Sequence, residues 1–380
     1  MKLKYPLSFI LTAFIITSCG GGGGAGTIFK PVITAFTAVA DSILVGNTTT
    51  VTWSSQNTTG CVAFGSWSGD KATSGSEVVT ISTPGENTFI LRCTGTNDAA
   101  GQVTETLAVE GFRLITGVTV DGYISGAEVF VDKNSNYIND SDEDSVTSDN
   151  SGAFSIKHSN GSLVSKGGTD LDTQVLLDNL MLVHKYSGYT ATKIISPITT
   201  ISSLLDGTVD VNTALGIDSS IDITSFDPVA NKGDGGINDY LFEKGNQLTT
   251  LALALDNITS SLSSSSSSSI DHFDIISKEI DKEYDTTSTK VDIESDSFIT
   301  NVLNTVITDK NLTITESNKQ NVLNALEGVL PIIQVKTSSD NTTSINRFAF
   351  STLQTDIAKL ADGSASATTV NNYTSDILAY

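Results

Sequence analysis

Short runs that alternate apolar and polar residues begin at about residue 28. From about residue 28 to residue 110 these runs are separated by Gly, Asn and Ser turns. A period of two places every second side chain on one face of a strand, as it does for Val51 with Trp53 and for Phe89 with Leu91 and Cys93. The pattern predicts an antiparallel β-sandwich over residues 28–110.

Residues 117–195 carry a second set of strand-like runs. Ala127, Val129 and Val131 alternate into one face, and Phe154 with Ile156 supplies another strand. This segment therefore predicts a second β domain.

The spacing changes to a helical period after residue 196. Ser196 can cap a helix that has Pro197 at its first position. Four apolar stripes follow, and we expect them to pack together as a bundle, although a groove for a lipid or a partner stays open as an alternative. The stripes are Leu241, Leu248, Leu251, Leu255, Ile258 and Leu262; Phe298, Val302 and Val306; Val322, Leu326 and Val329; and Ile345, Phe348, Leu353, Ile357 and Leu360. A run of seven serines, residues 263–269, predicts a flexible linker within this helical domain, which spans 196–380.

A twelve-residue polar stretch interrupts the second β domain between two predicted strands. It places oxygen donors at the first, third, fifth, ninth and twelfth positions of a calcium loop of the EF-hand type, with a backbone carbonyl at the seventh. The candidate ligands are Asp132, Asn134, Asn136, Ile138, Asp140 and Glu143. Tyr137 occupies the sixth position, where glycine normally makes a left-handed turn that tyrosine resists. A polar turn without an ion is the alternative.

The charge balance favours a cation over an anionic partner. The net charge is −22, from 43 acidic and 21 basic residues, so the chain lacks the basic surface that a nucleic acid needs. Six acidic side chains lie between Asp132 and Asp149, with only Lys133 to offset them. We therefore expect a structural Ca²⁺ with a Kd of ~10⁻⁴ to 10⁻³ M, as in extracellular modules.

The N-terminus has the features of an export signal. Lys2 and Lys4 precede an apolar run that is too short to span a bilayer, and Ile16-Thr17-Ser18-Cys19 follows. These four residues resemble the lipobox of bacterial lipoproteins. The resemblance implies a signal peptide over 1–18, lipidation of Cys19 and a Gly-rich tether over 19–27; an ordinary cleaved signal is the alternative. By resemblance to Gram-negative lipoproteins, a residue other than aspartate after the cysteine, here Gly20, implies the outer membrane, with the leaflet undetermined.

Two cysteines remain once Cys19 is assigned to lipid. In an oxidising compartment we expect Cys61 and Cys93 to pair. The surrounding pattern of Trp53, Cys61, Trp67 and Cys93 resembles a bacterial immunoglobulin-like module, which usually acts as a spacer or contact domain. Trp67 is interpreted as a loop anchor, with sugar stacking as the alternative.

The segment that surrounds the polar loop also carries a resemblance. Residues 126–132, the acidic loop and residues 147–156 are similar to the transthyretin-like β-sandwiches of carboxypeptidase-regulatory and serine-aspartate-repeat adhesin type, in which a calcium loop follows the first core strand. Two later segments, residues 167–170 and 195–201, resemble segments that recur in large proteobacterial surface proteins with the same calcium-loop sandwich. The predicted architecture is multidomain, with two all-β sandwiches followed by an all-α helical bundle.

Signals for catalysis are weak in the sequence. His158, His184 and His272 lack the spacing of a metalloprotease helix, and no cysteine remains free to act as a nucleophile. We expect a non-catalytic lipoprotein, anchored to the membrane through lipid, in which the β modules project the helical domain toward a cell-surface protein or glycan. Two alternatives are a ligand-binding or assembly lipoprotein that acts through its helices, and a hydrolase with an unrecognised active site.

Overall fold

The computed structural model describes residues 29–97, 100–185, 192–206, 209–264, 268–334 and 339–370. The predicted signal peptide, Cys19 and the Gly-rich tether lie outside these ranges. The chain divides into two compact units. The first holds the residues up to Val39, Thr50–Val79 and Thr88–Leu107, and the second holds Ala40–Thr49, Thr80–Asn87 and Ala108–Tyr380. The chain passes between the two units several times, the last time within one long strand, β8 (Gln102–Thr119).

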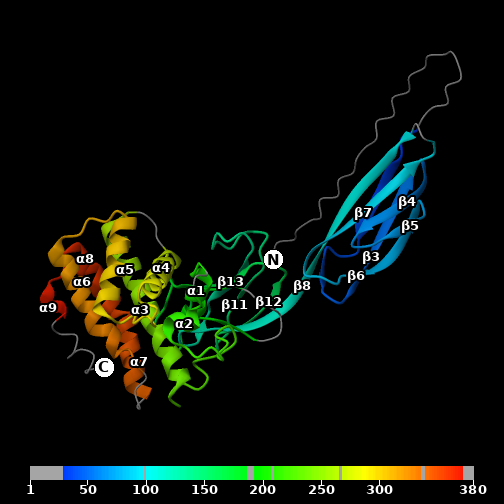
Figure 1. The fold of residues 1–380 in the computed structure, drawn as a ribbon. Coiled ribbons are helices and arrows are strands. Elements are labelled where there is room, and N and C mark those ends of the chain that lie inside the picture. The colour runs from blue at the N-terminus through cyan, green and yellow to red at the C-terminus, as the bar shows by residue number, and fades with distance from the viewer. Residues whose placement is uncertain are drawn as a thin grey trace. The chain divides into compact units, whose positions relative to one another are not determined.

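The first unit is built from antiparallel strands, as the alternating pattern predicted (Figure 1). Strands β1, β3 and β6 form one sheet, and β4 pairs with both β5 and β7. The strands are β1 (Val32–Ala38), β3 (Thr48–Gln56), β4 (Thr58–Gly65), β5 (Gly69–Lys71), β6 (Ser74–Thr80) and β7 (Gly85–Gly95).

Aromatic side chains fill the interior of the first unit. The Trp67 ring lies 5.4 Å from Trp53 and 6.0 Å from Phe89 in edge-on contacts, and it stacks on Phe36 at 5.8 Å. Its indole N–H donates to the carbonyl of Ile90 at 3.2 Å. Only 6% of Trp67 is exposed, which agrees with the loop-anchor interpretation.

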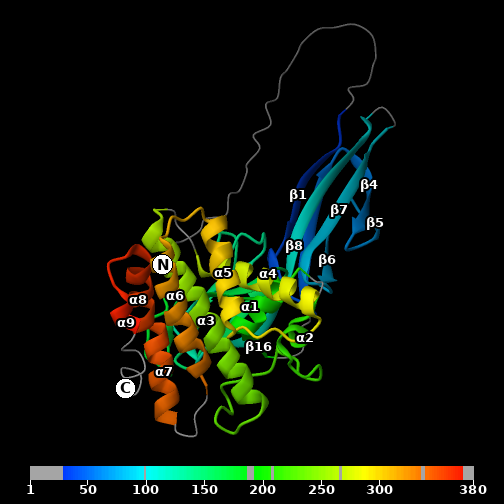
Figure 2. The ribbon, with the colours of Figure 1, turned by 60° about the vertical axis from the view of Figure 1, so that its left-hand side comes forward.

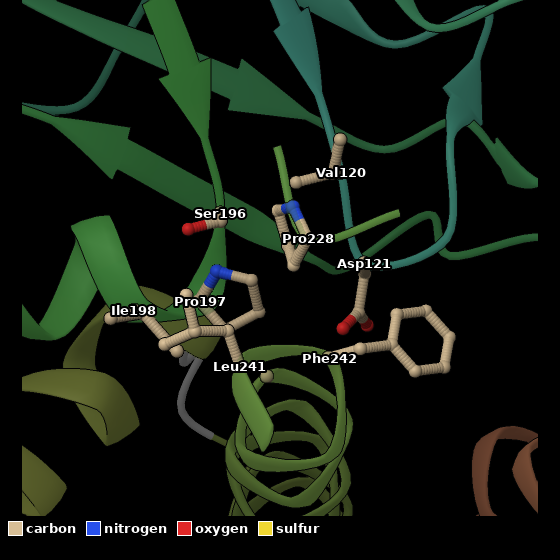
Figure 3. Close-up of a pocket in the computed structure, with 9 residues that line it drawn as sticks. Val120, Asp121, Ser196, Pro197, Ile198, Pro228, Leu241 and Phe242 are labelled. Atoms are coloured by element: carbon tan, nitrogen blue, oxygen red, sulfur yellow. The ribbon is translucent and has the colours of Figure 1, made fainter. Parts of the chain in front are cut away.

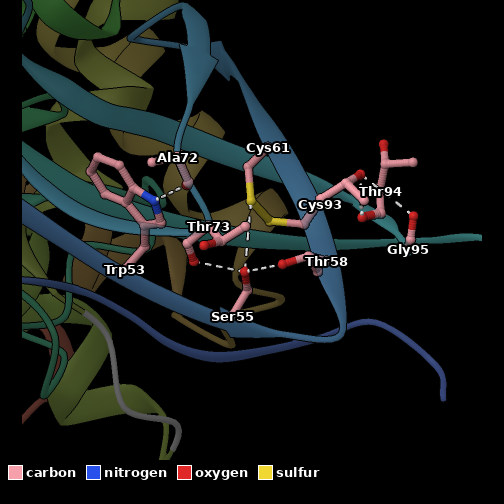
Figure 4. Close-up of a disulfide and its surroundings, with 10 residues drawn as sticks. Trp53, Ser55, Thr58, Cys61, Ala72, Thr73, Cys93, Thr94 and Gly95 are labelled. Atoms are coloured by element: carbon pink, nitrogen blue, oxygen red, sulfur yellow. Dashed lines mark hydrogen bonds between the residues drawn. A yellow bond between two sulfur atoms is a disulfide. The ribbon is translucent and has the colours of Figure 1, made fainter.

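The predicted disulfide between Cys61 and Cys93 is confirmed (Figure 4). The two cysteines lie directly opposite each other on the neighbouring strands β4 and β7, with their Cα atoms 4.0 Å apart. The bond therefore joins two strands of the same sheet, and it closes a loop of 32 residues. By the chain-entropy estimate such a loop contributes about 3 to 4 kcal/mol.

The second unit contains the strands predicted on both sides of the polar loop. Four of them form a sheet in the order β11-β10-β13-β15, while β12 pairs antiparallel and β16 parallel with β8. A small pair, β9 and β14, and the short β2, which is parallel to β8, complete the set. The bounds are β2 (Ser42–Leu44), β9 (Ile124–Ser125), β10 (Glu128–Asp132), β11 (Ser145–Thr147), β12 (Ala153–His158), β13 (Ser162–Lys166), β14 (Thr169–Asp170), β15 (Met181–His184) and β16 (Lys193–Ile195).

Helices make up the remainder of the second unit. They are α1 (Pro197–Leu204), α2 (Val211–Leu215), α3 (Ile237–Leu262), α4 (Ser269–Thr287), α5 (Asp296–Asp309), α6 (Glu316–Val329), the 3₁₀ turn η2 (Leu330–Ile332), α7 (Ser339–Phe350), α8 (Thr352–Asp362) and α9 (Ala367–Val370). Helix α3 is central and contacts α1, α4, α5, α7 and α8 (Figures 1 and 2). Ser196 caps α1 as predicted, because its hydroxyl accepts the N–H of Thr199 in a capping box.

Two helical predictions need correction. The fourth apolar stripe belongs to two helices, α7 and α8, which are separated at Ser351. The predicted serine linker is one residue too long, because Ser269 is the first residue of α4 and is fully buried, whereas Ser263 directly follows α3 and Ser268 directly precedes α4. Residues 265–267 of this run lie outside the described ranges.

A single hydrophobic cluster joins sheet and helices in the second unit. It runs from strand residues such as Ile115, Val129 and Leu163 to helical residues such as Leu251 and Phe298. The chain is thus a multidomain protein that mixes sheets and helices. The finer division into two separate sandwiches and a separate bundle stays a prediction.

Candidate calcium site

The polar loop connects two paired strands, as the sequence predicted. It leaves β10 at Asp132 and returns at Ser145 in β11, and these strands are antiparallel with Val129 opposite Val146. The backbone N–H of Val131 also donates to the carbonyl of Asp144 at 3.0 Å, so that the base of the loop is closed.

Asp132 organises the first half of the loop. Its side chain is buried, with 1% of the residue exposed. Its Oδ1 atom accepts the backbone N–H groups of Asn134 (3.3 Å), Ser135 (2.7 Å) and Asn136 (3.3 Å), and its Oδ2 atom accepts that of Tyr137 (3.0 Å). A carboxylate that receives several N–H groups fixes the chain tightly around itself.

Tyr137 makes the turn that the sequence put in doubt. Its φ angle is +58°, in the left-handed region where calcium loops normally place glycine. A side chain there costs about 1 to 2 kcal/mol, and such strain persists where the surroundings fix the conformation. Burial, followed by the charges of Asp132 and Asp274, raises the pKa of the Tyr137 phenol.

The other candidate ligands are drawn together around Asp140. The amide nitrogens of Asn134 and Asn136 donate to its Oδ2 atom at 2.8 Å and 2.9 Å. The Oδ1 atom of Asn136 accepts the N–H of Ile138 at 2.8 Å, and the Ile138 side chain is 61% exposed.

Glu143 ties the end of the loop to its beginning. Its Oε1 atom accepts the N–H of Lys133 at 2.7 Å, and its Oε2 atom accepts that of Asp140 at 3.1 Å. The Lys133 ammonium lies outside the ring of ligands, where it donates to the carbonyl of Asp142 and lies 3.6 Å from Glu110. The six predicted ligand residues therefore belong to one compact loop.

The donor set fits Ca²⁺, which prefers carboxylate, amide and carbonyl oxygens over nitrogen or sulfur. The carboxylates have lone pairs beyond those that bind backbone N–H groups. A rotation of each Asn amide by 180° would turn its oxygen toward Asp140, but it would give up the backbone N–H that this oxygen accepts, that of Asn136 for Asn134 and that of Ile138 for Asn136. Such a rotation is favourable only when a cation lies between the oxygens. Within the described ranges, no three His, Cys, Asp or Glu side chains gather closely enough to hold a metal on their own, so any site here depends on the amides and the carbonyl.

The three histidines are buried. Burial lowers the pKa of His158, and Lys133 of the loop lies close enough for its charge to lower that pKa further. His158 and His184 each bond to a backbone carbonyl, those of Gly161 (3.1 Å) and Ile194 (2.7 Å). The Nε2 atom of His272 lies 3.1 Å from the Thr259 hydroxyl, and its Nδ1 atom lies 3.8 Å from Asp256.

The His272 group has the order of a hydrolytic triad, which the sequence did not indicate because its members lie on two helices. All three residues are buried, at 3% exposed or less. The Thr259 hydroxyl also donates to the carbonyl of Leu255 at 2.8 Å, so its proton is already engaged. The group therefore links α3 to α4 and does not form an accessible nucleophile.

A further buried acidic side chain, Asp121, lies two residues beyond the end of β8, and no sequence pattern marks it. Asp121 is 3% exposed, and among the described residues neither of its carboxyl oxygens has a hydrogen-bond partner. It lines a cavity of about 10 Å³, the size of one water molecule, together with Pro197, Leu241 and Phe242 (Figure 3). Burial raises the pKa of Asp121 well above 3.8, and the nearby Asp170 raises it further. The Thr249 hydroxyl is near enough to lower the pKa in part, although it does not reach hydrogen-bond geometry.

No protein family model matches the chain, and no curated protein or solved structure matches it either. The resemblances described above therefore remain predictions. In the part of the chain that the structure describes, no helix has both the length and the apolar character needed to cross a membrane.

Proposed function

We propose that this chain is a non-catalytic lipoprotein of the bacterial outer membrane or cell surface, with a structural or adhesive role and a calcium-stiffened β module. Export and anchoring rest on the lipobox-like residues that end at Cys19. The finer architecture that we propose is an immunoglobulin-like first unit and a transthyretin-like sheet around the loop, followed by helices. The expected partner is a cell-surface protein or glycan.

One observation carries the calcium part of the proposal. Tyr137 adopts a φ angle of +58° at the sixth position, so the loop makes the turn that calcium loops require although it lacks the usual glycine. Without that turn, the residue that follows could not present its carbonyl toward the same centre as Asp132.

The loop residues have distinct tasks in this proposal. When bound, Ca²⁺ supplies a compact positive charge that offsets the acidic side chains of the loop and holds them together. Asp132, Asn134, Asn136 and Asp140 would each contribute one oxygen, directly or through water, Ile138 its carbonyl, and Glu143 two oxygens.

Calorimetric titration of the full chain with Ca²⁺ tests this site. We expect a Kd of ~10⁻⁴ to 10⁻³ M. At ~10 mM Ca²⁺ such an affinity stabilises the folded protein by about 1.4 to 2.7 kcal/mol, which a melting curve with and without EDTA detects. Glu143→Gln should abolish most of this shift, because it removes the bidentate ligand.

Asp142→Asn is the matched control, since it removes one negative charge from an exposed, non-ligand position of the same loop. A titration without heat, together with a melting temperature that EDTA leaves unchanged, would refute calcium binding.

The lipid anchor at Cys19 is tested separately. Cys19→Ser should abolish incorporation of labelled palmitate and release the protein from the membrane fraction, and retention there would contradict the anchor.

A further inference from the structure

Tyr137 does more than occupy the position of a glycine. Its half-buried side chain packs against a hydrophobic cluster of five buried residues that is distinct from the main core of the second unit. Four of them come from the sheet that carries the loop, and the fifth comes from helix α4. The five are Phe130, Val164, Met181, Val183 and Ile270.

The strand register explains why these residues meet. Phe130 of β10 lies opposite Val164 of β13, and Val164 lies opposite Val183 of β15, so the three side chains form a row across the sheet. Tyr137 adjoins this row from the loop, and Ile270 adjoins it from the first turn of α4.

The start of α4 is fixed to the same sheet by a hydrogen bond. The hydroxyl of Ser269 accepts the backbone N–H of Met181 at 2.7 Å, in a fully buried position. The first turn of α4 therefore depends on the position of β15 and of the cluster beneath it. Asp274, one turn further along α4, lies close enough to Tyr137 for its charge to raise the pKa of the phenol.

The backbone of Tyr137 is held by a hydrogen bond to a candidate ligand of the calcium loop. Its N–H donates to Oδ2 of Asp132, the first candidate calcium ligand and the residue around which the loop folds. Whatever holds the Asp132 carboxylate in place also holds residue 137, and with it the ring that packs on the cluster. A glycine would make the turn with less strain but would have no ring to place there.

We propose that Tyr137 couples occupancy of the calcium loop to the stability of helix α4, a regulatory role that rests on the proposed calcium site. Bound Ca²⁺ restrains Asp132, Asp132 restrains the backbone of Tyr137, and the tyrosine ring then stabilises the cluster on which Ile270 and the first turn of α4 rest. Tyr137 is a positioning residue in this scheme, since its side chain supplies no ligand.

Hydrogen–deuterium exchange of the full chain, in Ca²⁺ and in EDTA, tests this coupling. Ca²⁺ should slow exchange in the loop and also in the first half of α4, by about fivefold or more, the lower end of the usual coupling between two sites. Helix α6, whose main contacts are with α5, α8, α9 and η2, serves as the internal reference for global stabilisation.

Three variants locate the connection. Tyr137→Phe should behave like the wild type, because it keeps the ring. Tyr137→Gly should still show calcium-dependent protection of the loop while the protection of α4, relative to α6, is lost. Ile270→Ala should give the same loss from the helix side and does not alter the loop, so it serves if the glycine variant folds poorly.

The outcomes separate the two proposals. If Ca²⁺ protects the loop but leaves α4 unchanged relative to α6 in the wild type, the coupling is wrong and the calcium site stands. If Tyr137→Gly retains full protection of α4, another residue couples the loop to α4, and the role proposed for Tyr137 is wrong. If neither heat nor protection appears at the loop, the calcium site itself is wrong.

Discussion

Asp121 loses contact with water on folding and gains no hydrogen-bond partner among the described residues. Because burial and Asp170 raise its pKa, the folded state binds a proton at Asp121 more readily than the unfolded chain does. Stability therefore rises as the pH falls through the raised pKa toward 3.8, and it is lowest when the group is ionised. We predict that Asp121→Asn stabilises the protein near pH 8 by about 1 kcal/mol or more, because the neutral amide avoids the larger cost of burying an unpaired charge.

Urea unfolding of Asp121→Asn and wild type, at pH 8 and at pH 5, measures this difference. The advantage of the variant should shrink at the lower pH, where the wild-type carboxyl regains its proton. Asp234→Asn, at an exposed position, is the control and should change little. A variant that is less stable than wild type at pH 8 would show that the carboxylate has a partner that compensates its burial.

His272 has the opposite effect on stability. Burial, together with the charge of Lys310, lowers its pKa from 6.5 to about 4, although Asp271 and the backbone of Ser268 act in the other direction. Asp256 lies 3.8 Å from Nδ1, too far for a hydrogen bond that would retain the proton. The unfolded chain binds a proton below pH 6.5 and the folded protein does not, so stability is lost as the pH falls from about 6.5 to about 4.

The lost stability is of the order of 3 kcal/mol, from about 1.4 kcal/mol for each pKa unit. We predict that His272→Gln, which can still bond to the Thr259 hydroxyl, loses less stability between pH 7 and pH 4.5 than the wild type does. Thermal melts at the two pH values measure this loss. An unchanged pH dependence would assign the acid sensitivity to other groups.

At the scale of elements, the sequence predicts helices and strands most accurately where one hydrophobic period continues along the element. Helices α3, α5 and α6 were found from their apolar stripes, and β10 and β11 from their short alternating runs. Helix α4 is not among the predicted stripes, and its first residue was assigned to the serine linker, because serine favours neither helix nor strand. Ser269 is buried where its hydroxyl accepts the N–H of Met181. The candidate ligand positions could be proposed from the sequence because calcium chemistry restricts the spacing of such residues. The packing of Tyr137 depends on a helix more than 130 residues later, for which the local pattern has no signal.

At the scale of the whole molecule, the strands and helices of the second unit share one core on both sides of residue 196, where the predicted helical domain begins. Strand β15 and helix α1 exchange hydrogen bonds, since Thr199 donates to the carbonyl of Val183 at 3.0 Å and the N–H of Val183 donates to the Thr200 hydroxyl at 2.8 Å. The hydrophobic cluster crosses the same boundary without interruption. Removing the strands would expose the faces of α1 and α4 that they cover.

We therefore predict that a chain of residues 196–380 does not fold cooperatively by itself, although its helical sequence is intact. Far-ultraviolet circular dichroism should show partial helix content, and calorimetry should show no sharp transition, in contrast to the full chain. The full chain with Ile270→Ala controls for a general weakness of the helices, because it keeps the strands and should still melt cooperatively at a lower temperature. A cooperative transition in the fragment would show that the helices bury enough apolar surface among themselves, and that their shared core with the sheet adds stability without being required for folding.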